Sequence, residues 1–206
     1  MIEIGIASKN SDKIREIKTA LNLDFAKWLT YEDFPDWPAL PEETGRSFEE
    51  NARVKAVALA RFSGRYALAD DSGLEVHALN GRPGVRSARF AGPKATYEDN
   101  NKKLLRLLSN VSYNERLAHF RCVLCLADPA GDVYFADGLV EGHVGFEPRG
   151  RGGFGYDPLF IPLGYRKTMA ELSLEEKNRI SHRGQALRKM RAVLEKLKSD
   201  STVSRV

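Results

Sequence analysis

The apolar residues of this chain follow two alternating patterns, short continuous runs and helical repeats. The first run covers residues 2–7 and leads into a polar segment in which Asn10 or Ser11 can cap a helix. Beyond that cap Ile14 and Ile17 recur at helical spacing, which predicts one buried helix face. The same succession returns along the chain, so we expect strands and helices to alternate.

Further apolar runs and caps predict the remaining elements. The expected strands are residues 25–29, 66–70, 74–79, 117–127 and 133–140, the last two joined by a hairpin turn at 128–132. Helices begin where a hydroxyl residue can cap the first turn, often with a glutamate three residues later. The expected helices run from Ser47 to about Phe62, from Thr96 to Leu108, from Ser173 onward, and from about Ser181 to Leu197.

Alternating elements with a hairpin among them indicate an α/β fold with a mixed β-sheet. The 206 residues suffice for one domain in two lobes, which we place at residues 1–198 before a polar tail at 199–206. A hydrophobic content of 42% is ordinary for a globular protein. No apolar stretch is long enough to span a membrane, and the chain enters its first strand at once. The expected location is therefore the cytoplasm.

Cys122 and Cys125 form a C-x-x-C pattern inside an apolar run. Positions three apart on a strand face opposite sides, so the two thiols would not converge on a metal or form a disulfide. We interpret them as core cysteines in a reducing compartment.

The segment Gly152-Gly153-Phe154-Gly155-Tyr156-Asp157-Pro158 is the densest source of candidate chemistry. Glycines are conformationally costly, so three of them in four positions indicate a tight turn or a close approach to a ligand. The turn presents an aromatic ring, Phe154, and a carboxylate, Asp157. Such a turn is suited to stacking a planar ring and reading its edge.

A second candidate segment, Ser8-Lys9-Asn10-Ser11-Asp12-Lys13, opens the first predicted helix. A helix N-terminus presents N–H groups and a positive dipole end to anions, and Ser8, Asn10 and Lys13 add side-chain donors. We expect a triphosphate cradle here, although a capped helix with a solvated lysine is about equally consistent with this segment alone. The glycine spacing of a Walker loop is absent.

Two further groups carry charge that could serve catalysis. Asp70 and Asp71 follow a short strand, where carboxylates could bind Mg²⁺ and activate water, and only one of them can face a given site. Glu42 or Glu43 could add a metal ligand, although solvated loop charge is the simpler interpretation of either. Lys177, His182 and Arg183 surround the start of the last helix and could bind phosphate or a base carbonyl.

Five motifs in order resemble the inosine triphosphate pyrophosphatase family over residues 2 to 197. They begin at Ser8 (S-x-N-x-x-K-x-x-E), Ser47 (S-F-x-E-N-A), Ala69 (A-D-D-S-G-L), Gly153 (G-F-G-Y-D-P) and Ser181 (S-H-R-G-Q-A). The family commonly begins its first motif Thr-Gly-Asn, whereas this chain has Ser8-Lys9-Asn10 and so keeps the hydroxyl but not the glycine.

The resemblance implies a fold, an activity and roles for particular residues. The fold would be an elongated α/β protein with two lobes, a central substrate cleft and a homodimeric assembly. The activity would be Mg²⁺-dependent hydrolysis of non-standard purine nucleoside triphosphates (ITP, dITP, XTP) to monophosphate and pyrophosphate. Asp71 would be the general base and a metal ligand, with Glu42 a second ligand and Glu43 its uncertain neighbour. The substrate would be bound by Ser8, Lys9, Asn10, Ser11, Asp12, Lys13, Ser72, Phe154, Gly155, Tyr156, Asp157, Lys177, His182 and Arg183.

Two other functions are weighed against this one. A pyrophosphatase of the Maf-like group would act on modified pyrimidines, but the purine-sized shelf at Phe154 and the motif order argue against it. A module that binds single-stranded nucleic acid would use basic and aromatic groups, but Asp70 and Asp71 would repel a phosphate backbone. We therefore expect neither a nucleic-acid nor a membrane partner.

Overall fold

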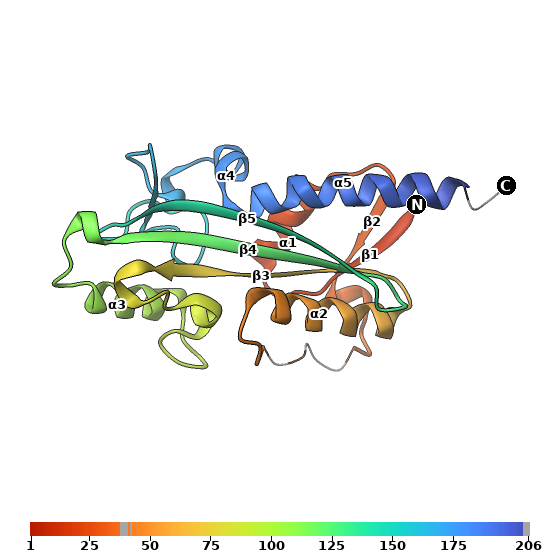
Figure 1. Cartoon of the computed structure of the whole chain (residues 1–206), viewed down its shortest axis with the longest axis horizontal. Coiled ribbons are helices and arrows are strands. Elements are labelled where there is room, and N and C mark those ends of the chain that lie inside the picture. Colours follow the sequence, from red (N-terminus) through yellow and green to blue (C-terminus); the bar gives the residue numbers. More distant parts are fainter. Residues whose placement is uncertain (38–40, 42, 204–206) are drawn as a thin grey trace. The chain divides into compact units, whose positions relative to one another are not determined.

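The structure is a computed structural model that describes residues 1–37, 41 and 43–203. The strands of the described residues form one sheet in the order β2-β1-β3-β4-β5-β6. β1 pairs in parallel with β2 and with β3, whereas β5 and β6 are antiparallel, so the predicted α/β class with a mixed sheet is confirmed (Figure 1). The strands are β1 (Ile2–Ile6), β2 (Ala26–Leu29), β3 (Tyr66–Val76), β4 (Leu117–Ala127), β5 (Val133–Val144) and β6 (Phe160–Pro162).

The helices begin at the predicted caps. Asn10, Ser47, Thr96 and Ser173 each accept a hydrogen bond from the backbone N–H three residues later, which satisfies a donor that the helix itself cannot pair. The α-helices are α1 (Ser11–Ala20), α2 (Phe48–Ser63), α3 (Tyr97–Leu107), α4 (Leu174–Ile180) and α5 (His182–Val203). Short 3₁₀ segments lie between them, at Tyr31–Asp33, His77–Leu79, Gly84–Arg89, Tyr113–Glu115 and Met169–Glu171.

Three elements differ from the prediction. β3 is one strand through Asp70 and Asp71, not two strands separated by a turn, because buried polar groups of the same unit satisfy these carboxylates and let the backbone stay extended. The last helix continues to Val203, beyond the predicted end at Leu197, since polar residues in a helix need no buried partner. β6 is only three residues long, too short for a periodic signal.

The chain divides into two compact units that we describe separately. The first comprises Met1–Asp71, Val123–Asp137 and Gln185–Val206. Here α2 packs closely on β1, since a Cβ at Gly5 would collide with the Leu59 side chain. Arg191 of α5 donates to the backbone carbonyl of Ala20 at the end of α1, at 3.0 Å. Figure 1 shows α2 on one side of the strands of this unit and α5 on the other.

The second unit comprises Ser72–Cys122 and Gly138–Gly184. Its core joins α3 to the strands through Leu104, Leu108, Phe120 and Phe160, all buried. Phe120 and Phe160 have ring centroids 4.6 Å apart. Figure 1 shows α3 and α4 on opposite sides of the strands of this unit, so each strand face is covered by a helix.

Both cysteines lie on β4 and are fully buried, and neither forms a disulfide. Burial raises the pKa of the Cys125 thiol to about 12, because the thiolate would lose its hydration. Their prediction as core residues is therefore confirmed. Among the described residues, no helix has both the length and the apolar character that crossing a membrane requires.

Candidate active site

The segment that opens α1 is a tightly hydrogen-bonded cap. Asn10 Oδ1 accepts from the Lys13 backbone N–H at 3.0 Å, and the Asn10 N–H is donated to Ser8 Oγ at 3.2 Å. Asp12 forms an exposed ion pair with Arg15 at 2.8 Å. The Lys9 ammonium lies 4.4 Å from the centre of the Tyr31 ring. The cap therefore holds the hydroxyl, amide and ammonium groups of the predicted cradle close together along the chain.

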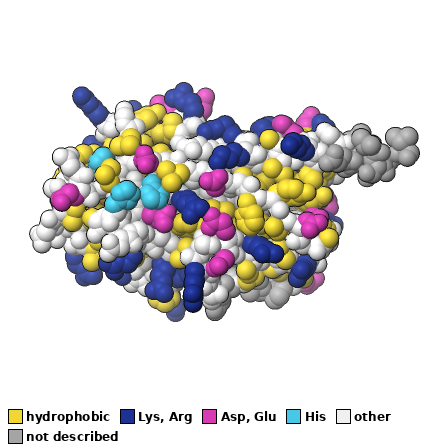
Figure 2. All heavy atoms as spheres, in the orientation of Figure 1, with side chains coloured by type: hydrophobic (Ala, Val, Ile, Leu, Met, Phe, Trp, Pro, Cys, Tyr) yellow, Lys and Arg dark blue, Asp and Glu magenta, His cyan; other side chains and the backbone are white. Residues whose placement is uncertain are grey.

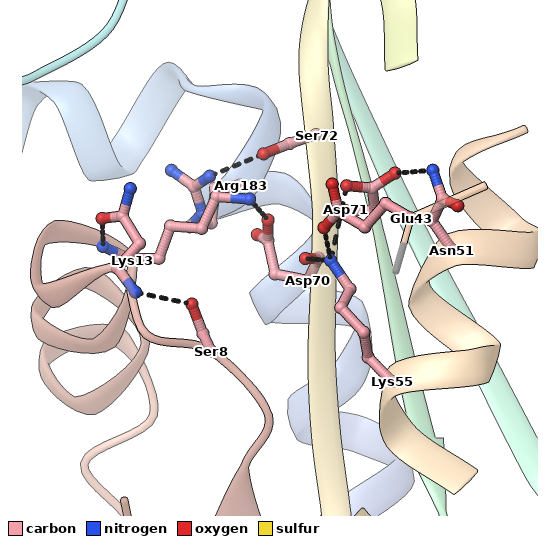
Figure 3. Close-up of polar contacts among 10 residues, drawn as sticks. Ser8, Lys13, Glu43, Asn51, Lys55, Asp70, Asp71, Ser72 and Arg183 are labelled. Carbon is pink, nitrogen blue, oxygen red and sulfur yellow. Dashed lines mark hydrogen bonds and ion pairs between the residues drawn. The ribbon is translucent and has the colours of Figure 1, made fainter. Parts of the chain in front are cut away.

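Lys13 is not a solvated lysine, because it forms an ion pair with Asp70. Its Nζ lies 2.6 Å from Asp70 Oδ1, and the Asp70 side chain is fully buried. Asp70 projects from β3 toward α1, whereas Asp71 projects from the opposite face of the strand toward α2 (Figure 3). This confirms that only one of the two carboxylates faces a given set of side chains, as strand geometry requires.

Asp71 lies in a polar cluster that α2 builds from two residues one turn apart. Asn51 Nδ2 donates to Asp71 Oδ2 at 2.9 Å, and Lys55 Nζ lies 3.4 Å from Asp71 Oδ1 (Figure 3). Lys55 Nζ also donates to Glu43 Oε1 at 2.6 Å and to the Asp70 carbonyl at 2.8 Å. Burial raises the pKa of Asp71, and the positive charges of Lys55 and Lys13 partly counteract that shift.

These carboxylates are suitable donors for a hard cation. Glu42, a predicted metal ligand, lies outside the described residues. Asp71 and Glu43 together hold one cationic group, the Lys55 ammonium. Their oxygens are also the donors that Mg²⁺ and Ca²⁺ take in proteins, so this donor set fits a divalent ion. Within the described ranges no group of three or more Asp, Glu, His or Cys side chains is arranged to hold a metal by itself.

In the second unit, the glycine-rich turn (residues 152–158) is organised by Asp157. Its Oδ2 accepts from the Phe154 backbone N–H at 2.8 Å and from Lys177 Nζ at 2.6 Å. Gly153 has a φ of +67°, and a Cβ there would collide with the Asp157 carboxylate, so this position requires glycine. The Phe154 ring therefore projects from a turn that the Asp157 carboxylate closes.

Two cations lie against the Phe154 ring. Lys177 Nζ is 4.8 Å and the Arg183 guanidinium carbon 5.3 Å from the ring centre. Arg183 also donates to Ser72 Oγ at 2.9 Å, and Lys177, at 3% exposure, is as buried as Asp157 (Figure 3 for Arg183 and Ser72). The structure thus brings three further predicted substrate-binding residues, Asp157, Lys177 and Arg183, together at Phe154.

The remaining predicted residues of this unit contact other residues of the same unit. The His182 ring is 95% buried and stacks on Phe120, with centroids 4.7 Å apart. The Tyr156 hydroxyl donates to the Ser87 carbonyl at 2.9 Å, and burial raises the pKa of this phenol. The Gly155 carbonyl accepts from the side chain of Asn101 at 3.0 Å. Their roles toward a substrate stay predictions.

Sequence reasoning missed two side chains of the first cluster. Asn51 belongs to a motif already noted, but its contact with Asp71 was not foreseen, and Lys55 was given no role. The available signal was spacing. Asn51 and Lys55 are four residues apart on one predicted helix, so they share a face, and both are polar on a helix that is otherwise largely apolar there.

This chain is similar in sequence to a family of known proteins. The sequence profile of the Ham1 family matches residues 4–193. A dITP/XTP pyrophosphatase of Geobacter sulfurreducens is 52% identical over 188 residues, covering 91% of this chain and 94% of the relative. Another, of Elusimicrobium minutum, is 50% identical over 193 residues, covering 92% of this chain and 98% of the relative.

Solved structures show the same fold. A HAM1 protein from Coxiella burnetii has a TM-score of 0.85 and 42% identity, covering 95% of this chain and all of that one. The Ham1 protein of Staphylococcus aureus has a TM-score of 0.82 and 42% identity, covering 94% and 98%. The similarity therefore extends over nearly the whole chain, in sequence and in fold.

Proposed function

Because this chain belongs to the Ham1 family, we infer that it is a nucleoside triphosphate pyrophosphatase. It hydrolyses the non-standard purine triphosphates dITP, ITP and XTP to the monophosphate and pyrophosphate, and so removes them from the nucleotide pool. The observation that carries this inference is the identity of about one half to dITP/XTP pyrophosphatases over nearly the full length of both chains.

The cluster around Asp71 supports a hydrolytic role for that carboxylate. Cleavage of the anhydride between the α and β phosphates needs a water that loses a proton as it attacks. Asp71 accepts that proton, while Asn51 and Lys55 fix the orientation of its two oxygens. The Lys55 ammonium also lowers the cost of keeping Asp71 ionised in a buried position.

The segment that opens α1 binds the phosphates. Lys13, Ser8 and Asn10 supply an ammonium, a hydroxyl and an amide next to the helix N-terminus, where anions are favoured. Lys9 lies next to this cap and adds a further positive charge, with Ser11 and Asp12 forming the first turn. In the second unit, Ser72 and Lys177 are the corresponding candidates for phosphate or ribose.

We propose Mg²⁺ as the cofactor, held by Asp71 with Glu43 or its neighbour Glu42. The carboxylate oxygens that share the Lys55 ammonium are of the type that this ion prefers. When bound, Mg²⁺ would neutralise triphosphate charge and make the leaving pyrophosphate more stable.

The base is recognised by the residues around the glycine-rich turn. Phe154 stacks on the purine, and Arg183 donates to the 6-keto oxygen that inosine and xanthosine carry and adenosine lacks. Asp157 and His182 are further candidates for contacts at the base edge. Asp157 also has the separate role of closing the turn through the Phe154 N–H.

We propose in addition that the chain acts as a homodimer in the cytoplasm, where its substrates arise. The dimer is implied by the family, and β5 carries exposed apolar side chains, Phe135 and Leu139, that an interface could cover. Free nucleotides, not nucleic acids or membranes, are its partners. On the face drawn in Figure 2, basic side chains are interspersed with acidic ones and do not form one continuous stripe.

The test is a substrate panel with product identification. The purified chain with Mg²⁺ is incubated with dITP, XTP, dATP, dGTP and modified pyrimidine triphosphates, and pyrophosphate and orthophosphate are measured separately. We expect pyrophosphate from dITP and XTP, with much slower turnover of dATP. Preference for a pyrimidine triphosphate, or release of orthophosphate in place of pyrophosphate, would refute the proposal, and so would specific binding of a single-stranded oligonucleotide without nucleotide hydrolysis.

A further inference from the structure

The Phe154 ring is not fixed by close packing on all sides. A cavity of about 510 Å³ lies beside it, lined among others by Tyr97, Asn101 and Gly153. Phe154 itself follows Gly153 and precedes Gly155, which both have positive φ, so its backbone lies in a turn of flexible residues. Asp157 holds the backbone N–H of Phe154, but the orientation of the ring for stacking depends on further contacts.

Helix α3 supplies two contacts to this turn. Asn101 Nδ2 donates to the carbonyl of Gly155, the residue directly after Phe154, at 3.0 Å. One turn earlier, the Tyr97 ring lies against the Phe154 ring with centroids 6.0 Å apart and planes tilted by 41°. Because residues four apart share one helix face, a single face of α3 contacts both the backbone and the ring.

The hydrogen bonding of Asn101 indicates that its amide contributes to this contact more than to stability. Its side chain is 92% buried, yet its Oδ1 has no hydrogen-bond partner among the described residues. An unpaired buried acceptor is unfavourable, and leucine has a similar shape without it. The hydrogen bond from Asn101 Nδ2 to the Gly155 carbonyl compensates for this unfavourable burial.

The adjacent residue shows what an asparagine held for structure looks like. Asn100 Oδ1 accepts from the Ala91 N–H at 2.7 Å, and its Nδ2 donates to the Ala88 carbonyl at 3.1 Å. Both polar atoms are thus paired, and both partners lie in or just after the Gly84–Arg89 segment, not in the glycine-rich turn. Asn100 is therefore a matched control on the same helix.

We propose that Asn101, assisted by Tyr97, is a positioning residue that orients Phe154 for stacking on the purine. The proposal rests on the proposed function and deepens it by assigning part of the base affinity to α3. It acts on base binding in the ground state and the transition state alike, so its loss raises KM and leaves kcat nearly unchanged.

The experiment compares Asn101→Leu with Asn100→Leu. Asn101→Leu should raise KM for dITP about five- to thirtyfold, because both a hydrogen bond and an oriented stacking ring are lost. Its kcat should stay within about twofold, and its melting temperature should be equal to or above that of Asn100→Leu, in which two paired groups are lost. Asn100→Leu should change KM by less than about twofold.

A second measurement excludes general damage to the site. Inorganic triphosphate has no base, so its inhibition constant should be the same in Asn101→Leu and the wild-type chain. Equal KM values for wild type and Asn101→Leu would overturn the proposal, as would a parallel loss of triphosphate inhibition. If Asn101→Leu does not fold, Tyr97→Leu at a position 42% exposed replaces it, with an expected two- to tenfold rise in KM.

Failure of the proposed function would be recognised separately. Calorimetric titration with dIMP measures base binding without hydrolysis. Weaker dIMP binding by Asn101→Leu than by Asn100→Leu supports the positioning role even if dITP is not turned over. Equal dIMP affinities in the two variants contradict it, whatever the catalytic activity.

Discussion

Lys13 and Asp70 form a close ion pair in which the carboxylate is fully buried. Removing one partner of such a pair takes away a charge that compensates the other, which is costlier than removing both. We therefore expect Lys13→Ala to lower the free energy of unfolding by about 3 kcal/mol and also to weaken triphosphate binding. The surface ion pair of Asp12 with Arg15 should contribute under about 1 kcal/mol.

The double variant Lys13→Met/Asp70→Asn separates the two roles of Lys13. It removes both charges of this ion pair together, so stability measured by urea unfolding should be higher than that of Lys13→Ala. The KM for dITP should stay raised, since the ammonium is still missing. Recovery of both properties together would show that Lys13 serves the fold alone.

We propose that Arg183 recognises the 6-keto oxygen of the base. It is 98% buried beside Phe154 and bonded to Ser72. Arg183→Met should lower the ratio of kcat/KM for ITP to that for ATP about ten- to a hundredfold. The variant loses a hydrogen-bond donor that the keto oxygen of ITP uses and that ATP does not. Ser72→Ala removes the same hydrogen bond but keeps the guanidinium, so its ITP/ATP ratio should stay near the wild-type value. If Arg183→Met leaves that ratio intact, base recognition lies elsewhere.

At the scale of elements, Arg116 joins the end of α3 to the rest of its unit. Its guanidinium donates to the carbonyls of Leu108, Val111 and Gly145 at 2.6 to 3.0 Å, and Phe146 covers it at 4.0 Å from the ring centre. Burial lowers the pKa of Arg116, because the charged form loses part of its hydration. The carbonyl of Leu108, the C-cap of α3, lacks a partner within the helix, and the Arg116 side chain supplies one.

Arg116→Met should therefore cost about 2–4 kcal/mol of the free energy of unfolding. Arg106→Met, an exposed position in the last turn of the same helix, should change it by under about 0.5 kcal/mol. Urea denaturation of both variants gives the comparison. Equal stabilities would mean that the three carbonyls are satisfied as well by water.

Elements whose signals are local were predictable from the sequence, and those that depend on packing were not. The caps at Asn10, Ser47, Thr96 and Ser173 are set by residues three positions apart, and the structure has all four. The continuity of β3 through Asp70 and Asp71 depends on Lys13 and Asn51, which come from distant helices. Such long-range pairings cannot be predicted from the spacing of residues in the sequence.

The candidate site shows the same limit. Asp71, Lys13 and the residues of the glycine-rich turn were expected from the motifs, which cover the chemistry of a nucleotide site. Lys55 and Asn101 were not expected from the motifs. The role of each depends on which carboxylate or carbonyl the fold places beside it. Residues that position others are thus harder to predict than those that touch a ligand.

At the scale of the whole molecule, the assembly is open to a direct measurement. A homodimer should have twice the 23.0 kDa of one chain. Light scattering after size exclusion at micromolar concentration gives this mass without reference to shape. A mass of one chain across the accessible concentrations would contradict the dimer.

The central claim is that the whole chain is a pyrophosphatase whose proton acceptor is Asp71. Wild type and Asp71→Asn are compared by pyrophosphate release from dITP with Mg²⁺, with melting temperature as the control for folding. Wild type should release one pyrophosphate for each dIMP, and the variant, still folded at the assay temperature, should have kcat lower by roughly 10²–10⁴-fold. Turnover of dITP by Asp71→Asn at the wild-type rate would contradict this account.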